Sequence, residues 1–301
     1  MPRTPAVELS EYNWSAENAR SEETVIEGTL QQPPKSSINL FKQDSDGDTI
    51  LHLATVQQHS SVDKLIDMMK NESLDVQNKR GQTALHLAVV LKQEDNIRRL
   101  IYAGASIAVV DCHGDTPLHI ACRTGKQTLV SLLLKKLLIS PSVGCESAMR
   151  TRNFEGETPL HIAVAHSFGT GNEAVIHLLV SNKCDVNLIE GKSGKTCLYM
   201  ALENQNYRLA NYLIDRGADV NIDAFSGTSP LHLACQAGDF DMVKKLLAKN
   251  AALTAKNAEY ESPKDVAATD EIRRLLDKAM KKERRRKYKE KDDLKRSSPR
   301  T

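Results

Sequence analysis

One eight-residue phrase, repeated six times with the same order of polar and apolar residues, constrains this chain more than any other feature. Its copies are GDTILHLA at Gly47, GQTALHLA at Gly81, GDTPLHIA at Gly114, GETPLHIA at Gly156, GKTCLYMA at Gly194 and GTSPLHLA at Gly227. The steps between these glycines are 34, 33, 42, 38 and 33 residues, and a degenerate seventh copy, YESPKDVA, begins 33 residues later at Tyr260. A repeat of this length indicates stacked supersecondary units, because one unit alone cannot bury its apolar face.

Each copy contains the signals that start a helix. Glycine permits a tight turn, threonine can cap the first helical turn, and proline at the first helical position has no N–H group to lose. A second apolar stretch with helical spacing follows in each unit, as in Ile97, Leu100 and Ile101. Gly104, Gly217 and Asn250 follow their helices where a left-handed cap is expected, and Lys183 takes that place in the fourth unit.

The spacing of about 33 residues is that of the ankyrin repeat. We therefore predict an all-α ankyrin-repeat solenoid with six clear repeats, a degenerate seventh capping repeat and projecting β-turn fingers. In the seventh copy, Lys264 and Asp265 replace the usual Leu and His, which suits a face without a further neighbour, and DEIRRLLDKAM is expected to form the closing helix.

Charge divides the chain into an acidic body and a basic end. Residues 278–301 contain 12 Lys or Arg and 4 Asp or Glu, so residues 1–277 carry a net charge of −6 within the total of +2. We predict a disordered acidic arm over residues 1–43, the repeat domain over 44–280, and a disordered basic tail over 281–301. The tail is either a nuclear-import or nucleic-acid-binding patch or the solvated end of the last helix. The first reading is favoured, with candidate import residues Lys281, Lys282, Arg284, Arg285, Arg286 and Lys287 and candidate phosphorylation sites Ser297 and Ser298.

The stretch IEGKSGKT at residues 189–196 ends like a nucleotide-binding loop. Such a loop needs an earlier glycine, and Ile189 stands in that place, while Gly194 and Thr196 belong to the fifth repeat. We expect no phosphate site here; ATP binding that depends on Lys195 would show the opposite.

Recurrent histidines and scattered cysteines are interpreted as structural. His52, His86, His119, His161 and His232 share one repeat position, so we expect hydrogen bonds between repeats rather than a metal cluster. Cys122 and Cys235 are expected to be small buried hydrophobic residues. No arrangement of nucleophile and base stands outside the repeat, so we predict a non-enzymatic protein without cofactor or metal.

The irregular repeats resemble those of the inhibitor-of-NF-κB (IκB, Cactus-like) family over about residues 44–277. The resemblance is carried by DSDGDTILHLA at Asp44, by the insertion LLISPSVGCESAMRTRNFEGETPLHIA between the third and fourth repeats, and by CDVNLIEGKSGKTCLYMALENQN with its lengthened turn. It implies binding of Rel-type transcription factor dimers: the first repeats would hold the basic import segment of the factor, and later turns and inner helices would meet its dimerisation domains.

Candidate partner-binding residues follow from their places in the projecting turns. Asp44, Asp46 and Asp48 form an acidic cluster that either attracts a basic peptide or merely caps and solvates the first repeat. Phe154 and Phe225 are candidate aromatic anchors, unless they pack on the neighbouring turn. The remaining candidates are Asn78, Lys79, Arg80, Asp111, His113, Asn153, Glu155, Glu190, Lys192 and Asp223.

The resemblance also suggests where the protein acts. The N-terminal arm contains no D-S-G-x-x-S degradation signal, and the basic end is similar to nuclear, co-regulatory members. We expect a monomer in cytoplasm and nucleus, with the nucleus favoured, which reaches DNA only through the bound factor and has no membrane partner. The alternative is a generic ankyrin adaptor or scaffold, such as a substrate receptor, for another protein.

Overall fold

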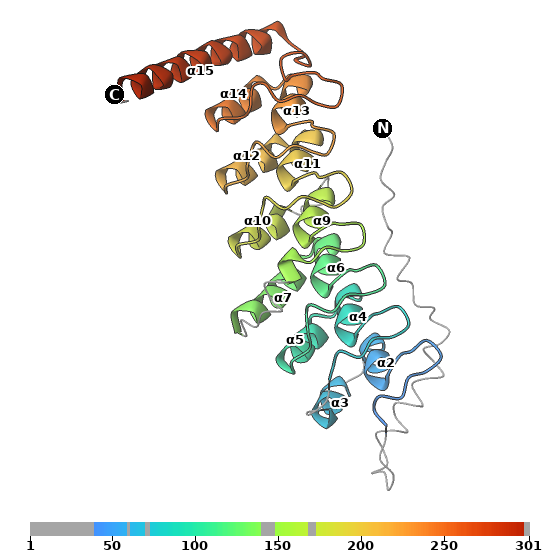
Figure 1. Cartoon of the computed structure of the whole chain (residues 1–301). Helices are drawn as coiled ribbons and strands as arrows, with labels where there is room; N and C mark the ends of the chain where they lie inside the picture. The colour runs from blue at the N-terminus through green and yellow to red at the C-terminus, as the bar shows by residue number, and fades with distance from the viewer. Residues whose placement is uncertain (1–38, 59–60, 70–72, 140–147, 168–172, 298–301) are drawn as a thin grey trace. The chain divides into compact units, whose positions relative to one another are not determined.

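A computed structural model describes residues 39–58, 61–69, 73–139, 148–167 and 173–297 (Figure 1). The expected arm up to residue 38, residues 140–147 of the insertion and Ser298 lie outside the described residues. The chain divides into two compact units, Met1–Cys184 and Asp185–Thr301, which are treated separately below. Both units consist of helices and turns, and the only β-pairing in the described parts is a single bridge between Ile189 and Thr196.

The described part of unit 1 is a stack of helix pairs. The pairs are α2 (Ile50–Val56) with α3 (Val62–Met68), α4 (Ala84–Val90) with α5 (Glu94–Tyr102), α6 (Pro117–Thr124) with α7 (Gln127–Ile139), and α9 (Pro159–Ala165) with α10 (Glu173–Ser181). First helices pack on first helices and second helices on second helices, as in α4 with α6 and α5 with α7. Their facing side chains, such as Leu85, Leu118 and Leu160, are fully buried. The repeats therefore share one continuous apolar interior within this unit.

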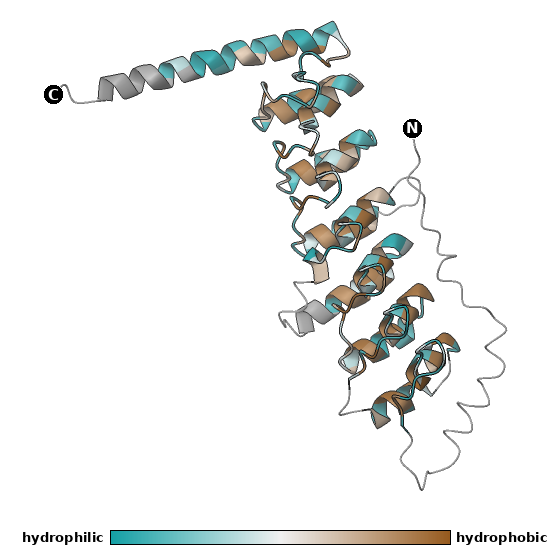
Figure 2. Cartoon of the chain, turned by 45° about the vertical axis from the view of Figure 1, so that its right-hand side comes forward, coloured by the Kyte–Doolittle hydropathy of each residue, from teal (hydrophilic) through white to brown (hydrophobic). Residues whose placement is uncertain are grey.

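Unit 2 continues the same pattern to the end of the chain. It contains α11 (Cys197–Glu203) with α12 (Tyr207–Asp215), α13 (Pro230–Ala237) with α14 (Phe240–Ala248), and the long α15 (Asp270–Ser297). Helix α11 packs on α13, and α14 packs on α15. Figure 2 shows many apolar residues in α11 to α14, whereas the coloured part of α15 is mostly hydrophilic.

The repeated threonine and histidine form a reciprocal cap at the start of α2, α4, α6 and α9, and Ser229 and His232 form the same cap in α13. In α6, the His119 N–H donates to Thr116 Oγ1, and the Thr116 N–H donates to His119 Nδ1 at 3.1 Å. The other ring nitrogen, Nε2, donates to the carbonyl oxygen of Glu157 in the next repeat at 3.2 Å. His52, His86 and His232 make the equivalent bond to Gln82, Asp115 and Glu261. The predicted hydrogen bonds between repeats are thus confirmed at these positions.

The seventh copy keeps this cap but changes its chemistry. Asp265 takes the place of histidine, and its Oδ2 accepts hydrogen bonds from Ser262 N–H at 2.8 Å and Ser262 Oγ at 2.6 Å. A carboxylate has no N–H group to offer a following repeat. Lys264, in the place of the usual buried leucine, pairs with Asp277 of α15 at 2.6 Å. The stack ends here because both residues that would face another repeat are charged.

Helix α15 closes the stack and then runs on. Its first turns are anchored by Ile272 and Leu276, both fully buried, and by the Ile272 N–H bond to Thr269 Oγ1. The helix extends to Ser297, so the predicted disorder of the tail is wrong over residues 281–297. Once the first turns are anchored, each further residue adds a backbone hydrogen bond without a new nucleation cost.

Candidate protein-binding surface

The β-turns that project between successive helix pairs, called fingers below, are held in register by backbone hydrogen bonds within each unit. In unit 1, Lys79 N–H donates to Asp46 O at 2.9 Å, Cys112 N–H to Arg80 O at 2.8 Å, and Phe154 N–H to His113 O at 3.0 Å. In unit 2, Phe225 N–H donates to Ser193 O and Ala258 N–H to Ser226 O, both at 2.8 Å. The tips of neighbouring fingers therefore present their side chains as an ordered row rather than as independent loops.

Several of the candidate residues point into the turns instead of toward solvent. Asp48 is only 2 % exposed, and its Oδ1 accepts a hydrogen bond from Asn78 Nδ2 at 2.8 Å. Burial raises the pKa of the Asp48 carboxyl group, and the bond from Asn78 opposes that rise. Asn78 Oδ1 in turn accepts the backbone N–H groups of Arg80 and Gln82. Asp48 and Asn78 thus join the first two fingers.

Asp111 and Asn153 have comparable positions in the third and fourth fingers. Asp111 is 3 % exposed, and its Oδ1 accepts hydrogen bonds from the N–H groups of His113 and Asp115. Burial raises the pKa of Asp111. Asn153 donates from Nδ2 to Asp115 Oδ1 at 2.9 Å, and Arg123 pairs with the other oxygen of Asp115 at 2.6 Å. Sequence reasoning missed this buried ion pair, whose only signal is one Asp and one Arg eight residues apart.

Glu190 explains why the GKSGKT stretch resembles a phosphate loop without needing a phosphate. Its carboxylate accepts the backbone N–H groups of Lys192, Ser193 and Lys195, the donors that an anion would use, and also the Ser193 hydroxyl group. Burial alone would raise the pKa of Glu190, but these hydrogen bonds outweigh it and lower the pKa below its usual value. The Lys195 ammonium group pairs with Glu203 at 2.9 Å. The turn is therefore filled by its own side chain.

Other candidates do lie at the finger tips with exposed side chains. Phe154 is 74 % exposed and Phe225 is 66 % exposed. One part of each ring packs on the glycine of the preceding finger: Phe154 Cδ1 lies 2.8 Å from where a Cβ atom at Gly114 would be, and the Phe225 ring covers Gly194 in the same way. Each ring is thus held in place while most of its surface faces solvent. The exposed charged or polar candidates are Asp44, Asp46, Lys79, Arg80, His113, Glu155, Lys192 and Asp223.

The last finger contains an aromatic residue that sequence reasoning did not select. Tyr260 is 84 % exposed and has φ +61°, in the place that glycine occupies in the earlier copies. A bulky residue in the left-handed region is unusual and strained. The sequence did contain a signal for this residue: Tyr260 lies 33 residues after Gly227, at the glycine position of the seventh copy.

The recurrent histidines and buried cysteines serve packing. Burial lowers the pKa of His86 and of His119 to about 4, so both rings are neutral near pH 7. Cys122 and Cys235 are fully buried as predicted, and burial raises the pKa of the Cys235 thiol to about 12. In the described ranges, no group of His, Cys, Asp and Glu has the arrangement of a metal site. None of the described helices combines the length and apolarity needed to span a membrane.

Comparison with known proteins agrees with this architecture. Residues 23–111, 95–190 and 167–257 each match the ankyrin-repeat family. The chain is 36 % identical over 252 residues to the B-cell lymphoma 3 protein homolog of Mus musculus, covering 82 % of this chain and 54 % of that protein. It is 37 % identical over 224 residues to NF-kappa-B inhibitor epsilon of Homo sapiens, covering 73 % and 44 %. The chain thus spans about half the length of these curated relatives.

Among solved structures, the chain is similar to the ankyrin repeat domain of Bcl-3, described as a unique member of the IkappaB protein family. The TM-score is 0.66 at 33 % identity, and the match covers 77 % of this chain and 99 % of that domain. A sequence identity of 33 % over nearly the whole of the matched domain extends beyond the fold. The chain belongs to the IκB family of ankyrin-repeat proteins.

Proposed function

We propose that this protein is a non-catalytic regulator that binds Rel/NF-κB-type transcription factor dimers through its finger tips. The observation that carries the proposal is the row of exposed side chains on fingers held in register by backbone hydrogen bonds, in a chain whose relatives include a protein named an NF-kappa-B inhibitor. Binding would mask the import segment of the factor or modulate its DNA binding and transcriptional output. The generic adaptor alternative is not favoured, because the similar proteins include NF-kappa-B inhibitor epsilon and the ankyrin repeat domain of Bcl-3.

Charge at the first finger supports contact with a basic segment. Asp44 and Asp46 are exposed, whereas Asp48 is buried in its bond to Asn78. Only the first two can therefore meet a partner directly. Asp44 Oδ1 also accepts the N–H groups of Asp46 and Asp48, so a substitution there must keep an acceptor. Exposed charges of this kind increase the association rate and lose their effect as salt increases.

The aromatic tips supply the apolar part of the surface. Aromatic side chains held at fixed positions lose little conformational entropy on binding and are frequent anchors of protein interfaces. Phe154 and Phe225 fit this description because each ring rests on a glycine of the preceding finger. Each unit thus contributes one such anchor, and the two can be tested independently.

Titration calorimetry with purified Rel-homology dimers tests the proposal. We expect Phe154→Ala and Phe225→Ala each to weaken binding about tenfold, which corresponds to about 1.4 kcal/mol. Tyr102→Ala is the matched control, since Tyr102 is 77 % exposed but lies at the end of α5, away from the fingers. Equal affinity of both phenylalanine variants and wild type would contradict the proposed surface, and no binding of the wild type would contradict the proposed function.

A charge variant tests the first finger separately. Asp44→Asn with Asp46→Asn keeps side-chain acceptors in the turn while removing two charges. We expect affinity to fall about threefold to tenfold at low ionic strength and less at high salt. An effect that does not depend on salt would contradict electrostatic attraction at this finger.

Regulation inside the nucleus requires that this protein enter the nucleus. Residues 281–287 remain the candidate import segment. Lys281, Lys282 and Arg284 are exposed on α15. Localisation of the chain with and without residues 281–301 tests this part of the proposal. We expect removal to reduce nuclear accumulation, and unchanged localisation would contradict it.

A further inference from the structure

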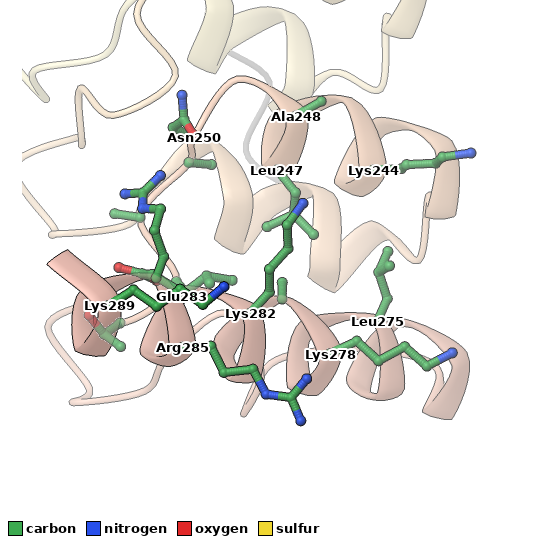
Figure 3. Close-up of a pocket in the computed structure, with 16 residues that line it drawn as sticks. Lys244, Leu247, Ala248, Asn250, Leu275, Lys278, Lys282, Glu283, Arg285 and Lys289 are labelled. Atoms are coloured by element: carbon green, nitrogen blue, oxygen red, sulfur yellow. The ribbon is translucent and has the colours of Figure 1, made fainter. Parts of the chain in front are cut away.

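The last two helices enclose a groove that the finger surface does not use. It has a volume of about 890 Å³ and lies between α14 and α15 (Figure 3). Helix α15 is held to the stack by the buried Ile272 and Leu276 of its first turns. Farther along, Leu275 and Ala279 of α15 and Leu247 of α14 are only partly covered and line the groove. The groove therefore has an apolar floor made by two helices.

Basic side chains surround this floor. Six line the groove, Lys244 from α14 and Lys278, Lys282, Arg285, Arg286 and Lys289 from α15, against one acid, Glu283, which gives a net charge of +5. Figure 3 shows Lys282 extending from α15 toward Leu247, while Lys244, Lys278 and Arg285 extend outward. Lys278, Lys282, Arg286 and Lys289 follow one another at spacings of three or four residues, so they share one side of the helix.

Cations elsewhere in unit 2 are arranged differently. Lys245 pairs with Asp215 at 3.0 Å, Lys256 with Asp265 at 3.3 Å, and Lys264 with Asp277 at 2.6 Å. Five cations of the groove have no ion pair with any acid in the part of the chain that the structure describes: Lys244, Lys278, Lys282, Arg285 and Lys289. Like charges one helical turn apart repel each other. Acids from outside the chain would relieve that repulsion.

We propose that the groove between α14 and α15 binds an acidic amphipathic helix of a protein partner. Carboxylates of the partner would pair with the basic rim, and apolar residues one helical turn apart would bury Leu247, Leu275 and Ala279. The apolar floor favours this partner over a nucleic acid, because a phosphate backbone gains nothing from contact with leucine side chains. The inference goes beyond Rel binding by the fingers, and it uses residues of α14, of α15 and of the segment that follows α14.

Fluorescence anisotropy with the full chain and three labelled probes tests the proposal. The probes are an amphipathic peptide of about 20 residues, with Leu and Phe at helical spacing among Glu and Asp, its scrambled version of identical composition, and a DNA duplex of about 20 base pairs. We expect the amphipathic peptide to bind about tenfold tighter than the scrambled one. Equal affinity of the two peptides, or no binding of either, would overturn the proposal.

Two kinds of variant separate the rim from the floor. Lys282→Glu with Arg285→Glu should weaken peptide binding about tenfold. Lys126→Glu with Arg152→Glu changes the net charge equally at exposed positions of unit 1 and should leave peptide binding unchanged. Loss of binding in this control as well would mean that only overall charge matters, which contradicts a defined groove.

Substitutions in the apolar floor distinguish binding of a peptide helix from binding of a nucleic acid. Leu247→Gln with Leu275→Gln changes no charge, so it should weaken the peptide about fivefold and leave the DNA probe unaffected. If this variant melts below the wild type, Ala248→Gln with Ala252→Gln, at exposed positions that line the same groove, replaces it. Tighter binding of DNA than of peptide, with no effect of the floor variants, would assign the groove to nucleic acid instead.

Discussion

The third and seventh repeats use the same position, three residues after the capping Thr or Ser, for opposite purposes. His119 is buried and neutral and links its repeat to the carbonyl oxygen of Glu157. Asp265 stands in the same place, makes the same local cap with Ser262, and is exposed. The hydrogen bonds of Ser262 lower the pKa of Asp265 to about 2, so it stays charged. The comparison teaches that one side chain decides whether the stack continues or ends.

Acidification should give the largest difference between the histidine and aspartate positions, because it destabilises the repeats that contain buried neutral histidines. The pKa of His86 and of His119 lies near 4 in the folded chain, below the ordinary value of 6.5, so the unfolded chain takes up protons first as pH falls. The stability that comes from keeping these two histidines neutral is present above about pH 6.5 and is lost as the pH falls from 6.5 to 4. We expect urea unfolding to show a loss of about 3 to 4 kcal/mol from pH 7 to pH 5.

Asp265 should contribute nothing to that loss. Its pKa of about 2 means that its stabilising effect is constant above pH 4 and falls only as pH falls through that value. The variant Asp265→Asn should therefore show the same change between pH 7 and pH 5 as the wild type. Equal stability of the wild type at both pH values would contradict the burial of neutral histidines.

Removing the His119 and Asp265 side chains in separate variants should give the next largest difference in stability. His119→Ala leaves the Thr116 N–H group without its acceptor and removes the bond from His119 to the Glu157 carbonyl oxygen, which keeps its bond from Asn153 N–H. We expect a loss of about 2 to 3 kcal/mol in chemical unfolding. Asp265→Ala removes an exposed carboxylate, and its loss of stability should be clearly smaller than that of His119→Ala. Similar losses in the two variants would mean that the link between repeats adds nothing to the local cap.

The glycine position of the finger should give the smallest effect. Gly114 has φ +75°, and a Cβ atom there would lie 2.7 Å from the backbone nitrogen of Phe154 in the next finger. Tyr260 has nearly the same φ, but in the described part of the chain it is followed by α15 and not by another finger. We expect Gly114→Ala to cost about 1 to 2 kcal/mol and Tyr260→Ala less than about 0.5 kcal/mol in thermal unfolding. Comparable costs would mean that neither the strained backbone nor the contact with Phe154 makes a side chain at position 114 unfavourable.

Much of the fold could be predicted from the sequence because its determinants are local and repeated. The caps at Thr83 and Thr116, the inter-repeat bonds of the histidines and the left-handed Lys183 all follow from residue type and position within one unit. The candidate surface could be predicted only in part. Phe154 and Lys79 lie at exposed tips, but Asp111 and Asn153 point inward, and sequence position alone cannot distinguish these directions.

The sequence by itself therefore determined the repeat, its caps and the end of the stack, since each depends on a few adjacent residues. Tertiary structure decided which finger residues are buried, how Glu190 fills its own turn, and that the basic end continues as helix α15. It also decided that Leu247 and Leu275 lie among basic side chains in one groove. These features depend on which surfaces meet in space, and packing between distant residues, rather than local preference, sets that outcome.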